Sequence, residues 1–466
     1  MEKDDTQKPA RQYIIKDQNI SANFLFQSEQ SNFIREMSNG DPDIQRPWEF
    51  YASAFSAQLN GNEDWSKLHL SVVPMYINWG NSDNGQAYFL SFADQVPSWQ
   101  GRYIPDSRGF YEAYRLIVTS YAIEYSADPT LQAKAREKAY ILEVALRDYD
   151  DGWINVGYRW RSFDSFQKST FPPNRWKSFD EWYASNGSNS MTILRDRITL
   201  ATAEYQSVMN NMGVSVALLA EAIKNVSNDA YFIRAKAEDG TVLPYPGYTT
   251  DFKFNDFVDT TLENLRKDPK YIAFHFNFNY QTGYRSESNT KWGASGNFSL
   301  GGGFAVNVGG NWEERRIDTS SKNFEVNVEF GGFREFVLKP GLWYSAAVLQ
   351  TIKNGPWVNN SVVDRWLKQG REIWGKDGLL SLQGISALIA IQPRIRISLS
   401  SNDYHYYRKA YSAGAGVSFF GFRIGGGGGG NEHITITWDD RFSTFEIIDN
   451  SGLPMLIATR SEVMPR

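Results

Sequence analysis

The chain has 466 residues, and its 48 Lys and Arg against 53 Asp and Glu give a net charge of −5, which does not indicate a basic nucleic-acid surface. It contains no cysteine, which excludes disulfides, thiol nucleophiles and cysteine-based zinc or iron–sulfur sites. An ordinary charged fraction of 22% together with 15 Trp, 25 Tyr and 30 Phe predicts a folded chain with an aromatic core.

Residues 1–45 are polar and predict an arm without a packed core. They hold early acidic residues and no apolar stretch of the kind that a classical secretory signal needs. The chain also lacks a run of about 18 apolar residues, so we expect no membrane-spanning helix. We therefore expect a chain that is made in soluble form, and its localisation, including release to the outside, stays open.

Residues 46–107 are rich in aromatic residues, Gly, Asn and Pro, and predict short strands and loops, with an apolar strand over 68–77. From residue 108 the apolar residues recur at helical spacing, which predicts a helical region over 108–230.

Residues 110–121 have apolar side chains at helical spacing, and three further segments are expected after them in the helical region. A helix begins at Asp128-Pro129, because Asp caps free amides and Pro fits the first turn, and it ends near Arg147. An aromatic-rich loop over 149–188 and a longer helix over 191–225 follow, and Gly213 is the weak point of that helix.

Strand patterns dominate residues 231–345 and 377–466, and a short helical connection over 346–376 separates them. In the connection, Ser361 and Asp364 have capping-box spacing and predict a helix over 361–374. Helices thus come first and strands later, which predicts an α+β fold with an N-terminal region of long helices and a C-terminal region of mainly antiparallel, Gly- and aromatic-rich strands. The expected strands are 274–280, 324–330, 395–399, 434–436 and 445–448.

Between Lys291 and Glu313 no residue is charged, and apolar side chains alternate with small or polar ones. A three-glycine turn over 301–303 predicts an amphipathic hairpin over 292–312, with Leu300 opposite Phe304 and Trp292 opposite Trp312. The candidate functional residues of this hairpin are Trp292, Phe298, Leu300, Gly301, Gly302, Gly303, Phe304, Val306, Val308 and Trp312.

A weaker second amphipathic segment precedes the six glycines 425–430. Phe419-Phe420 breaks its alternation and predicts a bulge or a change of face. Two such segments resemble, in architecture alone, the hairpins that β-pore-forming toxins deploy, although no toxin signature motif is present. The candidate residues of the second segment are Val417, Phe419, Phe420, Phe422 and Ile424.

The hairpin supports a first hypothesis, which is a non-enzymatic, self-associating protein of pore-forming type that inserts β-hairpins into a membrane. Each arm has about nine residues, close to the 9–11 of a tilted membrane strand. A soluble antiparallel sheet with one buried face alternates in the same way, so the pattern also fits a packed core. The many Gly, Ser, Asn and Ala residues of the arms, however, weaken a soluble strand pair.

Two alternatives remain open beside the membrane hypothesis. The first is a structural subunit of a tube, sheet or lattice, because Gly-rich strands allow close approach and aromatic residues favour interfaces. The second is a carbohydrate-binding protein or glycosidase, in which acid–Trp groups at 63–65 and 438–440 contact a sugar. The expected partners are therefore the protein itself, a lipid membrane or a glycan, and not a nucleic acid.

The sequence indicates no catalytic, cofactor or metal residues. The four histidines, His69, His275, His405 and His433, form neither an HxH nor an HExxH pair. The acidic run 148–152 lacks the Glu of a calcium loop, since residue 158 is Tyr. The glycines 425–430 are not followed by the Lys-Ser/Thr of a phosphate loop.

Overall fold

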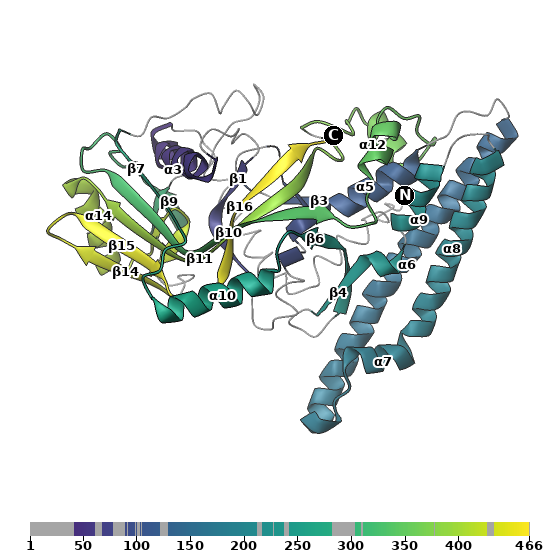
Figure 1. Cartoon of the computed structure of the whole chain (residues 1–466), viewed down its shortest axis with the longest axis horizontal. Helices are drawn as coiled ribbons and strands as arrows, with labels where there is room; N and C mark the ends of the chain where they lie inside the picture. The colour runs from purple at the N-terminus through teal and green to yellow at the C-terminus, as the bar shows by residue number, and fades with distance from the viewer. Residues whose placement is uncertain are drawn as a thin grey trace, which may run out of the picture.

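The protein has an α+β fold in which helices dominate the middle of the sequence and antiparallel strands its C-terminal half (Figure 1). This arrangement confirms the fold class expected from the order of the helical and strand patterns. The computed structural model describes residues 42–60, 68–77, 89–90, 92–97, 99, 103, 105–121, 129–211, 217–226, 228–236, 242–281, 303–308, 311–376, 378–425 and 433–465.

A long helical hairpin projects from one end of the molecule (Figure 1). Helix α6 (Pro129–Thr170) runs outward, and α8 (Ser188–Asn211) runs back beside it. The short helix α7 (Phe179–Asn186) lies near the far end, between the two. At about 1.5 Å per residue, α6 is roughly 63 Å long. The middle of α6 lies next to α5 (Phe110–Ser120), where Arg115 pairs with Asp150. Helix α5 in turn packs beside α9 (Ala217–Val226).

The predicted loop over 149–188 is wrong, because α6 continues unbroken to Thr170 and α7 follows. The helix passes through the acidic run because Asp150 pairs with Arg115 of α5 at 2.7 Å. Gly152 lies where the two long helices approach closely, since a Cβ there would be 2.5 Å from Leu194 Cδ1. The aromatic residues that suggested a loop instead form the core of the hairpin, with Trp153 and Trp160 buried.

The predicted helix over 191–225 is present as two described helices, α8 and α9. Residues 212–216 between them, including Gly213, lie outside the described residues.

Among the described residues the main β-structure is an eight-stranded antiparallel sheet, called the large sheet below. Its central pair is β10 (Glu325–Pro340) with β11 (Leu382–Ser398), in a register that places Val328 opposite Ile395. The strands expected over 274–280, 324–330, 395–399, 434–436 and 445–448 are part of it. The other strands are β1 (Leu68–Tyr76), β6 (Tyr248–Thr250), β7 (Phe274–Asn279), β14 (Ile434–Asp439), β15 (Thr444–Asp449) and β16 (Pro454–Val463).

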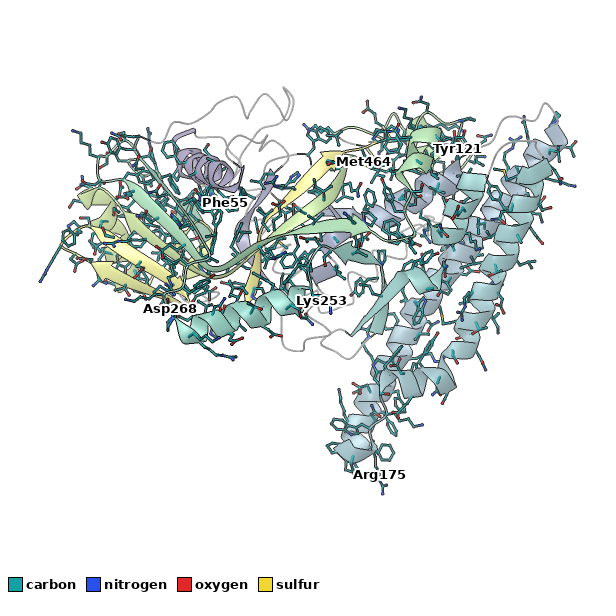
Figure 2. All side chains as sticks on the ribbon, in the orientation of Figure 1. Phe55, Tyr121, Arg175, Lys253, Asp268 and Met464 are labelled. Carbon is teal, nitrogen blue, oxygen red and sulfur yellow. The ribbon has the colours of Figure 1, made fainter. Side chains whose placement is uncertain are left out.

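Two hydrophobic cores share the central strands of the large sheet. Phe336 and Leu338 of β10 belong to the core beside the helices, and Val326 and Val328 to the core at the other end. Helix α10 (Phe254–Lys267) lies along the sheet between them (Figure 2). It approaches closely at Gly332, where a Cβ would lie 2.3 Å from Thr261 Cγ2.

The N-terminal segment is described from residue 42 and forms α3 (Pro42–Asn60), so the expectation of a polar arm and short strands fails here. The helix forms because Trp48, Tyr51 and Phe55 recur at helical spacing and are buried together. They pack on β7, with ring centroids 5.1 Å apart for Tyr51 and Phe276.

The remaining elements are short. Helix α13 (Val362–Lys368) confirms the start of the helix predicted over 361–374, but it ends at Lys368. The Ser361 hydroxyl caps it by accepting from the Asp364 amide at 3.1 Å. The others are α12 (Ala346–Ile352), α14 (Ser401–Ser412), the strand pairs β2 (Gln95–Pro97) with β3 (Pro105–Gly109) and β4 (Phe232–Lys236) with β5 (Val242–Pro246), and the 3-10 turns η2 (Pro173–Arg175) and η3 (Asp229–Tyr231).

Candidate functional site

The two amphipathic segments singled out in the sequence lie side by side in one four-stranded antiparallel sheet, called the small sheet below. Its strand order is β13-β12-β8-β9. The contact between the segments is the β8–β12 pair, in which Val306 faces Val417 and Phe304 faces Phe419. The strands are β8 (Phe304–Val308), β9 (Asn311–Glu314), β12 (Val417–Phe419) and β13 (Phe422–Ile424).

The predicted hairpin over 292–312 is wrong in its second arm. The register of β8 and β9 pairs Val308 with Asn311 and Asn307 with Trp312, so the chain reverses inside the expected arm. The intervening sequence is Gly309-Gly310, a dipeptide that suits a two-residue hairpin turn. Phe304 pairs with Phe419 on one edge of β8, and its carbonyl accepts from the Arg315 amide at 2.9 Å on the other. Trp292, Phe298, Leu300, Gly301 and Gly302 lie outside the described residues.

The second segment contains a turn where a bulge or change of face was expected. Phe420 and Gly421 have φ values of 49° and 83° and connect β12 to β13, which pair as Phe419 with Phe422. A positive φ is uncommon for Phe. Packing compensates for it, because the Phe420 ring contacts the rings of Trp48 and Phe304 at 5.4 and 5.3 Å between centroids.

The apolar residues of the small sheet are buried inside the protein. The Phe419 ring lies 4.4 Å from that of Phe445 and 5.2 Å from that of Tyr407. Burial of the seven side chains named in the next sentence, at about 1.5–3 kcal/mol each, favours this conformation by roughly 10–20 kcal/mol as an upper bound. The buried residues with described side chains are Phe304, Val306, Val417, Phe419, Phe420, Phe422 and Ile424.

Helix α3 closes over one end of the small sheet. The Phe420 amide donates to the Gly303 carbonyl at 2.7 Å, which holds the start of β8 to the β12–β13 turn. A Cβ on Gly303 would lie 3.0 Å from Pro47 Cβ and 3.1 Å from Phe420 Cε1. Only glycine therefore lets α3 approach the sheet this closely without a shift.

The small sheet is attached to the large sheet by side-chain packing. Within the described part of the chain, no strand of one sheet pairs with a strand of the other. Its surroundings also hold three buried polar atoms that have no hydrogen-bond partner among the described residues: Trp48 Nε1, the Tyr407 hydroxyl and Trp438 Nε1. Such atoms each cost about 1–3 kcal/mol. Burial raises the pKa of Tyr407 well above its ordinary value, so its hydroxyl stays neutral.

In the acid–Trp group at 438–440 the Trp438 ring packs against neighbouring rings, whereas the Asp440 side chain is exposed. The Trp438 ring contacts those of Tyr404 and Phe445 at 5.6 and 4.9 Å between centroids. The Tyr404 hydroxyl donates to Asp440 Oδ1 at 2.7 Å. The other such group, at 63–65, lies outside the described residues.

The histidines lie in separate places: His69 is buried, and a 2.5 Å hydrogen bond joins its Nε2 to Ser461 Oγ. Among the described residues, no three His, Asp or Glu side chains lie close enough to hold a metal ion. Nor does any helix in the described ranges have the length and apolar character to cross a membrane. No family model, no curated protein and no solved structure matches this chain.

Proposed function

We propose that this is a non-enzymatic, self-associating protein that acts on membranes and that the small sheet is the part it releases toward the lipid. The observation that carries the proposal is the pairing of β8 with β12, which unites two amphipathic, Gly-flanked segments from distant parts of the sequence. They form one unit that can move together.

Two features of the small sheet support release. Side-chain packing holds it, so separation from the large sheet breaks no strand ladder among the described residues. Three nearby buried polar atoms, on Trp48, Tyr407 and Trp438, gain hydrogen bonds when the packing opens. Burial of the apolar side chains opposes release, because exposing them to water is unfavourable. Lipid must therefore take the place of the protein core around these side chains.

A reversible disulfide lock tests this function directly. Pro47→Cys with Gly303→Cys joins α3 to the small sheet, because the two Cβ positions lie 3.0 Å apart and a shift of about half an ångström reaches disulfide geometry. The absence of natural cysteines makes the bond unique. We expect the oxidised protein to leave dye-loaded liposomes intact, and leakage to return when the bond is reduced.

The two single-cysteine variants are the controls, and they leak under oxidising conditions. Leakage from the oxidised double variant would show that the small sheet is not the released part. A wild-type protein that causes no leakage at any pH or lipid composition would contradict the membrane function as a whole.

A second candidate is a structural subunit of an ordered assembly. The observation that favours it lies on α8, where Ile193 and Leu200 are each 62% exposed and stand seven residues apart on one face. Such a stripe suits contact between copies of the chain. Sedimentation without lipid tests it: particles larger than the monomer that disappear in Ile193→Lys/Leu200→Lys support assembly, and a uniform monomer contradicts it.

A further inference from the structure

The far end of the helical hairpin carries a compact group of exposed aromatic side chains. The tip, defined as residues 165–179, includes the end of α6 and the turn into α7. Phe166, Phe171 and Trp176 are 55%, 41% and 39% exposed there. Figure 2 shows Arg175 at the extreme end of the projection, remote from both sheets. The tip therefore meets a flat surface that faces this end before the body of the protein does.

Hydrogen bonds hold the tip in a fixed shape. The buried Gln167 amide donates to Asp164 at 2.9 Å and to the Lys177 carbonyl at 3.1 Å, and it accepts from the Lys177 amide at 2.8 Å. Trp176 Nε1 donates to the Phe171 carbonyl at 2.8 Å. Little conformational freedom remains to be lost when this tip binds.

The tip carries three basic side chains. Residues 165–179 contain Lys168, Arg175 and Lys177, and the acidic residues Asp164, Asp180 and Glu181 flank them in the sequence. Lys168 is held by Asp164 of the preceding turn at 2.6 Å, and its Nζ lies 5.9 Å from the Trp176 ring centroid. Exposed basic and aromatic residues thus share one small end of the molecule.

We infer that the tip docks on a bilayer that contains anionic lipids. Trp and Phe rings partition into the headgroup region, and Lys and Arg are attracted to the anionic surface. A protein partner fits less well, because stable interfaces need about 20–30 residues a side and the tip is one short, convex end. The inference rests on the proposed membrane function but concerns attachment, not release of the small sheet.

Charge reversal at the tip tests the electrostatic part. Arg175→Glu/Lys177→Glu should weaken sedimentation with phosphatidylcholine vesicles containing phosphatidylserine by about 25-fold or more, at about fivefold for each charge removed. The matched control, Lys134→Glu/Arg136→Glu, makes the same charge change in the exposed first turns of α6, at the opposite end of the same helix, and should bind like the wild type. High salt should weaken wild-type binding as well.

A single label locates the contact, because the chain has no cysteine of its own. An environment-sensitive dye on Asn174→Cys, within the tip, should shift to the blue with anionic vesicles. The same dye on Ala133→Cys, in the exposed first turns of α6, should not shift. Phe171→Ala/Trp176→Ala should reduce both the shift and the binding, by roughly three- to tenfold for each ring.

The outcomes separate attachment from release. The oxidised Pro47→Cys/Gly303→Cys protein should bind anionic vesicles like the wild type while it causes no leakage. Equal binding of Arg175→Glu/Lys177→Glu and Lys134→Glu/Arg136→Glu to anionic vesicles would overturn the inference. Binding of the protein to polyglutamate beads but not to anionic vesicles would also overturn it, because the partner of the tip would then be an acidic protein.

Discussion

Replacing Phe419 by Ala removes the side chain at the centre of the small sheet. The ring is fully buried and lies within 5.5 Å, between centroids, of the rings of Phe304, Tyr407 and Phe445. Loss of the buried surface costs about 1.5–3 kcal/mol, and the cavity and the lost ring contacts add to it. We expect a total of about 3–5 kcal/mol, the usual range for Phe→Ala in a core.

Hydrogen–deuterium exchange measures this loss where it acts. If the small sheet opens locally, 3 kcal/mol corresponds to exchange about a hundredfold faster in peptides that cover β8, β12 and β13. Phe442→Ala is the matched control, because Phe442 is 69% exposed and its removal should change stability by no more than about 0.5 kcal/mol. Exchange in Phe419→Ala that matches this control would refute the packing of β12 described above.

Three further substitutions test the body of the protein by urea denaturation. Arg115→Met leaves Asp150 without its 2.7 Å partner and should lower the free energy of unfolding by about 3 kcal/mol. The double variant Arg115→Met/Asp150→Leu should recover most of that loss. A loss in the double variant as large as in Arg115→Met would contradict the pairing. Desolvation, and then repulsion from Asp150, raises the pKa of Asp151 above its ordinary value of 3.8, so its ionisation opposes folding. Asp151→Asn should therefore raise the urea midpoint at pH 7 but not below pH 3.8, and a lower midpoint at pH 7 would contradict this. Gly332→Ala should lower the free energy of unfolding by about 1–3 kcal/mol, because the new Cβ meets Thr261 of α10. The double variant Gly332→Ala/Thr261→Ala should lose less, and an equal loss would contradict this position of α10.

The sequence predicted β1, β7, β14, β15 and parts of β10 and β11, because their signal is local. Strands β6 and β16 were not expected. Residues 274–280 and 324–330 alternate in hydrophobicity, and β7 and β10 pair with one another in the structure. The helical spacing of Trp48, Tyr51 and Phe55 is equally local, yet the aromatic and Pro-rich composition around it favoured short strands. Spacing was a better guide than composition for α3.

The small sheet could not be predicted from one segment alone. Glycine pairs or triplets stand at both 301–303 and 309–310, so each place allows a reversal of the chain. A turn after Val308 places the charged Glu313 opposite the apolar Val306. The alternation of apolar and polar residues in this segment disfavours that pairing. It forms because β12, more than a hundred residues later, supplies the apolar partners on the other edge of β8. Such long-range pairing leaves no mark in the sequence of β8.

The continuity of β10 and β11 limits how the protein can be divided. Both strands pass through the two hydrophobic cores, so each core is built partly from the same two stretches of backbone. A cut anywhere within these strands leaves two fragments with incomplete cores and unpaired strand edges. Nicking by a protease should therefore be tolerated in connections outside the central pair, and fragments meant to carry the helical hairpin or the small sheet must be taken without splitting β10 or β11.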